Sequence, residues 1–247
     1  MTGRSETHRK LDAFSQHLLD ACRFVLVSPS LSANIGSAVR ALTTMGIPDL
    51  MVAAPRDAAF REDAGALALA AGAEARLAQV GSRPSLDAAL ADCQLAVAVS
   101  AEGREFGPPP AFPGPLCAEV LGMLSAGQVQ RMAFVFGTER TGLGTAEMAR
   151  CQRWLTIPAD ADYSSLNLAQ AVQIVAFSLR QAVLEREAGH ARASGDATPT
   201  GAHSGEPPRT LAGQPTDVRG RGDEASLGTG VRHDGNRGAR PSERLAD

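Results

Sequence analysis

The sequence predicts an α/β fold: an open, mainly parallel sheet with flanking helices. Short apolar runs alternate with stretches of helical periodicity. Most of these runs are apolar throughout, as strands are when both faces of a parallel sheet are covered. The expected strands are Phe24–Val27, Leu50–Ala53, Leu95–Val99, Ala133–Phe136 and Trp154–Ile157. The expected helices between them are Asn34–Met45, Asp63–Ala71, Ser85–Ala91, Leu116–Ser125 and Thr145–Cys151.

A long amphipathic helix is predicted from Leu166 to about Glu187. The apolar residues that recur there at helical spacing are Leu168, Val172, Val175, Leu179 and Val183. In an open α/β sheet, ligands bind outside the carboxyl ends of the strands. We therefore expect functional residues in the loops that directly follow the apolar runs.

The composition divides the chain into three parts. Residues 1–22 are expected to form an N-terminal helix or extension, and residues 23–188 the folded domain. From residue 189 to residue 247 the chain is rich in Gly, Pro, Ser, Thr, Arg and Asp and poor in aliphatic and aromatic residues. Such a segment cannot bury enough apolar area to offset the entropy of ordering it. We expect residues 189–247 to be a disordered tail.

Lysine and histidine are nearly absent from the predicted domain, which excludes several kinds of chemistry. Lys10 is the only lysine, so a Walker-type phosphate loop and a Schiff-base lysine are excluded. The five histidines precede the first strand or lie in the predicted tail. We therefore expect neither a His-based catalytic triad nor a metal site. The four cysteines form no C-x-x-C pair, which argues against a zinc knuckle.

Nothing in the sequence predicts association with a membrane. No stretch approaches the roughly 20 consecutive apolar residues of a membrane helix. The start MTGRSETHRK is unlike a signal peptide, so we expect a cytoplasmic protein. The net charge of −3 argues against an extended basic surface for nucleic acid but leaves room for a local arginine patch.

Residues 28–46, which follow the first strand, have features of an anion-binding site. Asn34 is placed to start the helix, and Gly36 permits a close approach of backbone. Arg40 adds a permanent positive charge near this helix start. The alternative is that Arg40 is a solvated helix residue and Gly36 a packing glycine. The segment lacks a G-x-G-x-x-G pattern, so it does not support a dinucleotide-binding turn.

The loop GTERTGLGTAEM, residues 137–148, follows the apolar run that ends at Phe136. Its three glycines make it conformationally permissive, and Glu139 places a carboxylate at the exit of the strand. Glu139 is a candidate acceptor for a hydroxyl or an amine, and the alternative is an ion pair with an arginine. A helix cap by Thr145 explains the end of this loop but not its start.

The segment IPADADYSSLNLAQAVQIV, residues 157–175, brings polar groups to the start of the long helix. Ser164, Ser165 and Asn167 offer hydroxyls, a carboxamide and unpaired backbone amides in one small volume. Ordinary helix capping by a serine explains one of these residues. It does not explain the whole string.

Three motifs together resemble a known family. NIGSAVRAL, FVFGTERTGL and IPADADYSSLNLAQAVQI occur in the order and approximate spacing of SPOUT-class RNA 2′-O-methyltransferases of the TrmH-like branch. The chain is most similar to the TrmJ-type tRNA (cytidine/uridine-2′-O-)-methyltransferases, over roughly residues 23–182. The resemblance implies a SPOUT fold with a C-terminal trefoil knot, a homodimer, and S-adenosyl-L-methionine as cofactor. It also implies methylation of a ribose 2′-hydroxyl in tRNA, at anticodon-loop position 32.

The resemblance also assigns roles to individual residues. The implied cofactor-binding residues are Val99, Ser100, Ala101, Gly137, Ile157, Ser164, Ser165 and Leu166. The implied substrate-binding residues are Asn34, Arg104, Glu139 and Asn167. Arg40 matches the arginine that the family places at the ribose hydroxyl. Because a guanidinium is a poor base, we expect Arg40 to orient phosphate and stabilise the developing alkoxide. Ser165 is expected to help place the ribose or the cofactor, which makes Arg40 and Ser165 the catalytic residues.

Two departures from the TrmJ-type pattern leave other interpretations open. Glu102 stands where that pattern has an arginine, so Arg104 is the only basic residue of its loop. A low-complexity segment stands where a helical extension is usual. The alternatives are methylation of another tRNA site or of ribosomal RNA, and a non-catalytic protein that binds the cofactor or RNA.

Overall fold

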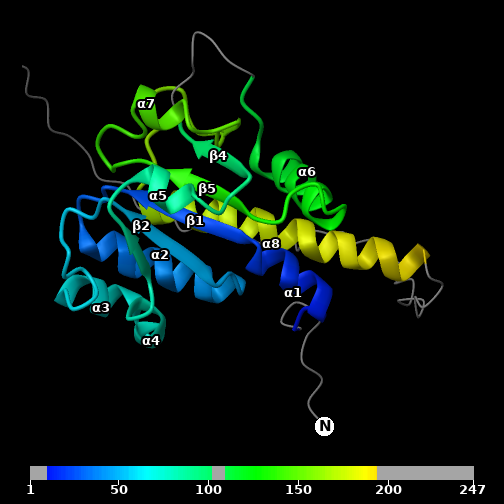
Figure 1. Cartoon of the computed structure of the whole chain (residues 1–247), viewed down its shortest axis with the longest axis horizontal. Helices are drawn as coiled ribbons and strands as arrows, with labels where there is room; N and C mark the ends of the chain where they lie inside the picture. Colours follow the sequence, from blue (N-terminus) through cyan, green and yellow to red (C-terminus); the bar gives the residue numbers. More distant parts are fainter. Residues whose placement is uncertain (1–9, 102–108, 194–247) are drawn as a thin grey trace, which may run out of the picture. The chain divides into compact units, whose positions relative to one another are not determined.

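The computed structural model describes residues 10–101 and 109–193, which fold around a six-stranded parallel sheet (Figure 1). The strands, in the spatial order β3-β2-β1-β5-β4-β6, are β1 (Cys22–Val27), β2 (Asp49–Ala53), β3 (Gly81–Arg83), β4 (Leu95–Val99), β5 (Met132–Phe136) and β6 (Arg153–Leu155). The helices are α1 (Ala13–Asp20), α2 (Ser32–Met45), α3 (Ala64–Ala70), α4 (Glu74–Leu77), α5 (Leu86–Leu90), α6 (Pro113–Ser125), α7 (Thr145–Met148) and α8 (Leu168–Ala193). The predicted α/β class with an open parallel sheet is confirmed.

Helices cover the two faces of the sheet unequally. Successive residues of a strand point to opposite faces. Phe24 and Leu26 belong to the large core that includes α1, α2, α3, α4, α6 and α8, whereas Val25 and Val27 belong to a smaller core with α5. In Figure 1, α8 runs behind the strands and α5 lies in front of them. Both faces are therefore buried, which explains why the strands are apolar throughout.

β1, β2 and β5 begin one or two residues earlier than predicted, and β3 and β6 differ in other ways. β3 was not expected, because its sequence Gly-Ser-Arg contains no apolar residue. It is one of the two edge strands of the sheet and pairs with β2 in parallel register. β6 ends at Leu155 rather than Ile157, because the N–H of Thr156 donates to the carbonyl of Ala111 (3.0 Å) and not to a neighbouring strand.

All six predicted helices are present with shifted bounds; α6 begins at Pro113 rather than Leu116, α7 ends at Met148 rather than Cys151, and the shifts of α2 and α8 bear on the site. α2 begins at Ser32, so Asn34 lies inside its first turn instead of starting it. α8 begins at Leu168 and continues past Glu187 to Ala193. The predicted boundary at residue 189 between domain and tail therefore falls within a helix.

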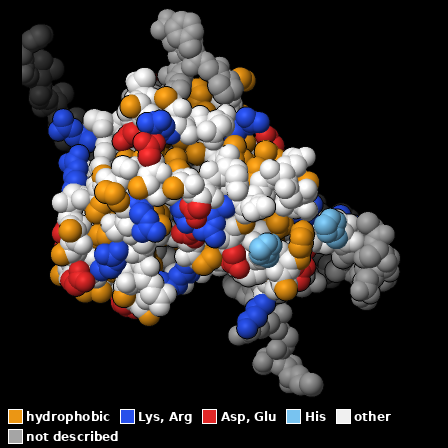
Figure 2. Space-filling view, in the orientation of Figure 1, with side chains coloured by type: hydrophobic (Ala, Val, Ile, Leu, Met, Phe, Trp, Pro, Cys, Tyr) orange, Lys and Arg blue, Asp and Glu red, His pale blue; other side chains and the backbone are white. Residues whose placement is uncertain are grey.

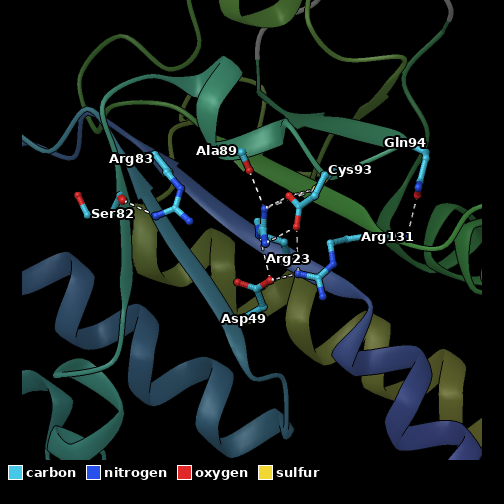
Figure 3. A network of polar contacts seen from close by, with 9 residues as sticks. Arg23, Asp49, Ser82, Arg83, Ala89, Cys93, Gln94 and Arg131 are labelled. Atoms are coloured by element: carbon cyan, nitrogen blue, oxygen red, sulfur yellow. Dashed lines mark hydrogen bonds and ion pairs between the residues drawn. The ribbon is translucent and has the colours of Figure 1, made fainter.

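A network of arginines and aspartates lies at the amino ends of the strands (Figure 3). Arg23, whose side chain is 8% exposed, bonds Asp49 at 2.9 Å and Asp92 at 2.5 Å. Nη1 of Arg131 lies 3.1 Å from Asp49 and 3.4 Å from Asp92. The hydrogen bond from Arg23 holds the pKa of Asp92 below its ordinary value. Each buried charge has a partner of opposite sign, as a stable interior requires, so the network is a structural feature of this edge.

Some predictions concern parts of the chain outside the described residues. These parts are residues 1–9, the loop with Glu102 and Arg104, and residues 194–247 of the predicted tail. Among the residues that are described, no helix is both long and apolar enough to cross a membrane. Nor does any group of three or more His, Cys, Asp or Glu in those ranges have an arrangement suited to a metal ion.

Candidate functional site

A pocket of about 190 Å³ lies at the carboxyl ends of β4, β5 and β6, against the start of α8. Its lining residues are Val99, Ser100, Ala101, Phe136, Gly137, Thr138, Glu139, Arg140, Thr141, Gly142, Leu143, Ile157, Ser164, Ser165, Leu166, Leu168 and Ala171. This is the edge of an open α/β sheet at which ligands bind. Every residue that the resemblance assigned to the cofactor lines this one pocket.

The loop after β5 folds back on itself and forms one wall of the pocket. The N–H of Thr138 donates to the carbonyl of Gly142 (3.1 Å), and the N–H of Gly142 donates to that of Thr138 (3.0 Å). Gly142 has a φ of +62°, in the left-handed region that favours glycine. A Cβ atom on Gly137 would lie 2.0 Å from the carbonyl carbon of Gly142. Both glycines are therefore required by the turn itself.

Glu139 ties this loop to the segment that follows β1. Its carboxylate accepts the N–H groups of Ser30 (2.7 Å) and Leu31 (3.2 Å) and the side-chain amide of Asn34 (2.9 Å). Partial burial raises the pKa of Glu139, but hydrogen bonds from Asn34 and Ser30 outweigh it and hold the pKa below its ordinary value. The carboxylate is ionised and already bonded within the protein. This geometry favours a structural role over a contact with substrate.

Asn34 and Asn167 extend the network to α8. Oδ1 of Asn34, a residue only 7% exposed, accepts the side-chain amide of Asn167 (3.1 Å). Oδ1 of Asn167 in turn accepts the N–H groups of Ala169 (2.9 Å) and Gln170 (3.3 Å). These are N–H groups that the start of a helix leaves unpaired. Asn167, rather than a serine, therefore caps α8.

Arg40 and Ser165 lie on two sides of the start of α8. Ser165 lines the pocket, whereas Arg40 lines a neighbouring, more open hollow together with Asn167 and Gln170. Arg40 is exposed and forms no ion pair within the part of the chain that the structure describes. The start of α8 lines both hollows and separates them. Groups bound in the two hollows would therefore be neighbours.

Gly36 belongs to a helix contact rather than to a ligand site. A Cβ atom at this position would lie 2.0 Å from the carbonyl oxygen of Ala66 in α3. Only a residue without a side chain permits this approach of α2 to α3. Of the two interpretations of Gly36, the packing glycine is confirmed.

Several lining residues were not singled out from the sequence. They are Phe136, Thr138, Thr141, Leu143 and Ala171. The first four belong to the motif FVFGTERTGL and Ala171 to IPADADYSSLNLAQAVQI, and these motifs were the available signal. The inward direction of a side chain in an irregular loop depends on the turn geometry, which the motif alone does not reveal.

Comparison with known proteins identifies a family. The model of the SpoU rRNA Methylase family matches residues 21–177. The tRNA (cytidine/uridine-2′-O-)-methyltransferase TrmJ of Pectobacterium atrosepticum is 42% identical over 171 residues, which are 68% of this chain and 68% of the relative. The chain thus spans about two thirds of the length of the curated relatives it matches.

Solved structures of similar sequence have the same fold. A probable methyltransferase from Bordetella pertussis Tohama I is 38% identical with a TM-score of 0.64, covering 68% of this chain and 99% of that one. TrmJ from Z. mobilis ZM4 is 30% identical with a TM-score of 0.58, covering 72% of this chain and 82% of that one. The family match extends over most of the described residues and includes every residue that lines the pocket. On this evidence the chain belongs to the SpoU methylase family.

Proposed function

We propose that the protein transfers a methyl group from S-adenosyl-L-methionine to a ribose 2′-hydroxyl of tRNA, in the anticodon loop at position 32. The observation that carries this proposal is the pocket of three loops with exposed Arg40 across the start of α8. The tRNA substrate is supported by relatives described as tRNA (cytidine/uridine-2′-O-)-methyltransferases. Ribosomal RNA is the second candidate, because the matching family model is named for rRNA methylases.

The residues of the pocket fit S-adenosyl-L-methionine. Val99, Ile157 and Leu166 provide apolar surface, and Ser164 and Ser165 provide hydroxyls. Backbone groups of the irregular loops add donors and acceptors suited to adenine, ribose and amino-acid groups. The proposed contacts are Val99, Ser100, Ala101, Gly137, Ile157, Ser164, Ser165 and Leu166. When bound, the cofactor supplies an electrophilic methyl group carried on a sulfonium.

Arg40 and Ser165 position the RNA hydroxyl in this proposal. A guanidinium stays charged and has no acceptor atom, so Arg40 is not the base. Arg40 holds a phosphate and stabilises the negative charge that develops on the ribose oxygen, while Ser165 orients the ribose. No histidine or lysine is among the described lining residues, and Glu139 is bonded within the protein. The hydroxyl proton therefore leaves to water, and most of the rate gain comes from positioning.

The predicted substrate-binding residues divide into two groups. Asn34 bonds both Glu139 and Asn167, and these bonds hold the segments after β1, after β5 and before α8 in fixed relation, so the three residues support the substrate site as a frame. Arg104 remains a predicted RNA contact in a loop outside the described residues.

The trefoil knot and the homodimer are part of the proposal. β6 lies at the edge of the sheet beside β4, yet the chain after it reaches the loop of β5 before entering α8. The segment after β6 therefore passes β4 on its way to α8. Such a path supports the trefoil knot proposed for the C-terminal part of the chain. Phe14 on α1 and Phe177 on α8 are 48% and 54% exposed, which supports a covered surface in a dimer. Analytical ultracentrifugation measures the dimer directly, and a monomer at micromolar concentration would contradict it.

Methyl transfer from labelled S-adenosyl-L-methionine to unmodified total tRNA tests the function. Nuclease digestion and mass spectrometry of the nucleosides are expected to show a 2′-O-methylated cytidine or uridine. Transfer to ribosomal RNA alone would replace tRNA as the substrate class. Cofactor binding without transfer to either RNA would contradict the enzymatic proposal.

Arg40→Ala is expected to lower the single-turnover rate about 100- to 1,000-fold, as loss of one group that stabilises a developing oxyanion does. Cofactor affinity, measured by calorimetry, is expected to stay unchanged because Arg40 lies outside the pocket. Arg153→Ala is the matched control, since this arginine is exposed at the amino end of β6 and pairs with Glu119. Loss of cofactor binding in Arg40→Ala would indicate a structural role instead.

A further inference from the structure

We propose that Arg56, Leu31 and Arg140 form a strip that binds the RNA sugar–phosphate backbone beside the target nucleotide. Arg140 follows β5, Leu31 follows β1 and Arg56 follows β2, and these strands are neighbours in the sheet. Neighbouring strands lie about 4.8 Å apart, so the strip extends over roughly 10 Å. The inference rests on the proposed function and specifies how its substrate is held.

The position of Arg140 is fixed by the residue before it. Glu139 bonds the N–H groups of Ser30 and Leu31 at 2.7 and 3.2 Å. The backbone of Arg140 is therefore one residue from a contact with the segment after β1. Arg140 itself is exposed at the rim of the pocket.

The position of Arg56 is fixed in the same way from the other side. Asp57 accepts the hydroxyl of Ser32 (3.1 Å) and the N–H of Ala59 (2.9 Å). Asp57 thus holds the loop after β2 against the start of α2. Arg56 and Arg140 flank the same segment, and the exposed Leu31 (59%) lies within it. An exposed apolar side chain between two arginines suits contact with a ribose or a base.

The charges of the two arginines, like that of Arg40, are not neutralised by a carboxylate among the described residues. Arg56 and Arg140 form no ion pair with any residue that the structure describes. The paired arginines are Arg23, Arg131, Arg150 and Arg153. On the face shown in Figure 2, basic and acidic side chains are intermixed. The carboxylates next to the strip, those of Asp57 and Glu139, are already bonded to protein donors.

The loop after β6, at the other end of this edge, has acidic residues and no basic one, whereas the loop after β2 has Arg56 and Arg61 beside its acidic residues. Asp160 and Asp162 are exposed in the loop after β6, on the far side of the pocket from β2. Their charges repel phosphate, whereas Arg56 and Arg140 attract it. The RNA backbone is therefore expected to leave the pocket over β1 and β2.

RNA binding in the absence of cofactor tests the strip, because Arg140 also lines the cofactor pocket. Arg56→Gln and Arg140→Gln are each expected to weaken binding of an unmodified tRNA transcript about three- to tenfold. Each should also reduce the slope of log K against log salt by about 0.7–0.9, the value for one phosphate contact. Arg153→Gln removes the same charge at the amino end of β6 and is expected to change neither the affinity for tRNA nor the salt slope.

Methylation of the same tRNA by the wild-type protein separates the two proposals. If the wild type methylates tRNA while both variants keep its affinity and salt slope, the strip is overturned and the function stands. If the variants weaken RNA binding but the wild type transfers no methyl group, the strip stands and the function fails. Arg56→Gln should keep wild-type cofactor affinity, which shows that weaker RNA binding is not caused by unfolding.

Discussion

At Glu139 one carboxylate joins two loops that are 109 residues apart in the chain. It accepts bonds from Ser30, Leu31 and Asn34, and Asn34 continues the chain of bonds to Asn167. Hydrogen bonds to an ionised acceptor are stronger than neutral ones. The geometry of both loops therefore depends on the charge of this side chain.

Glu139→Gln is expected to make the free energy of unfolding of the domain less dependent on pH in the acid range. The pKa of Glu139 is lower in the folded protein than its ordinary value of about 4.3. The ionised form thus adds stability above about pH 4.3, and this contribution is lost as the pH falls through the lowered pKa. Urea unfolding at pH 7 and near pH 3.5 should show the variant less stable than wild type at pH 7, with the gap closing in acid.

Glu62→Gln is the control for this measurement. Glu62 is exposed in the loop between β2 and α3, and the substitution removes the same charge outside the two segments that Glu139 joins. It should follow the pH dependence of the wild type. A stability gap in Glu139→Gln that is equal at both pH values would contradict the role of the charge.

The sequence predicted which residues gather here but not what they bond. Asn34, Glu139 and Asn167 were expected at one edge because each follows an apolar run. A helix cap joins near neighbours, yet even here the capping residues differ from those expected: Asn34 lies inside α2, and Asn167 rather than a serine caps α8. The bond between Asn34 and Glu139 exists because β1 and β5 are adjacent in the sheet, and no local pattern reveals that adjacency.

The contact between α2 and α3 depends on Gly36, and Gly36→Ala is expected to destabilise the domain by about 1–3 kcal/mol. The added Cβ would lie 2.0 Å from the carbonyl oxygen of Ala66, which is backbone and cannot rotate away. Gly122→Ala is the matched control, because a Cβ there meets nothing within 4 Å. This second change is expected to stabilise α6 by about 0.5–1 kcal/mol. Urea unfolding that gives both variants the same sign would contradict the packing argument.

Elements with a strong apolar pattern were predicted well, and elements made by context were not. Leu95–Val99 was predicted with its observed bounds, since it is apolar and buried on both faces. β3 has no such pattern and is a strand because β2 offers a free edge. A Cβ on Gly81 would lie 2.6 Å from the end of the Met51 side chain, so a larger residue there would displace that flexible side chain. This contact becomes visible only once both strands are placed.

The two edges of the sheet differ in the state of their charges. At the amino edge Arg23 and Arg131 are paired with aspartates, so their charges are satisfied within the protein. At the carboxyl edge Arg40, Arg56 and Arg140 are exposed, while the carboxylates of Asp57 and Glu139 are bonded to backbone or neutral groups. The molecule thus has one edge built for stability and one with charge available for an anionic substrate.

The C-terminal limit of the folded unit is expected at the end of α8. A chain ending at Ala193 should keep the free energy of unfolding of the full chain, because the residues beyond it contain few apolar side chains to bury. A chain ending at Ser178 should fail to fold. It lacks Leu179 and Val183, which are fully buried, and removal of buried aliphatic side chains destabilises by about 2–5 kcal/mol each.

Thermal unfolding followed by circular dichroism, together with tRNA binding at several salt concentrations, separates stability from function in these truncations. If the chain ending at Ala193 melts below the full chain, residues 194–247 contribute to packing and the composition argument is wrong. If it melts like the full chain but binds tRNA more weakly, those residues act on RNA without supporting the fold. Their arginines then contribute to RNA binding, and the salt dependence of RNA binding should fall with truncation.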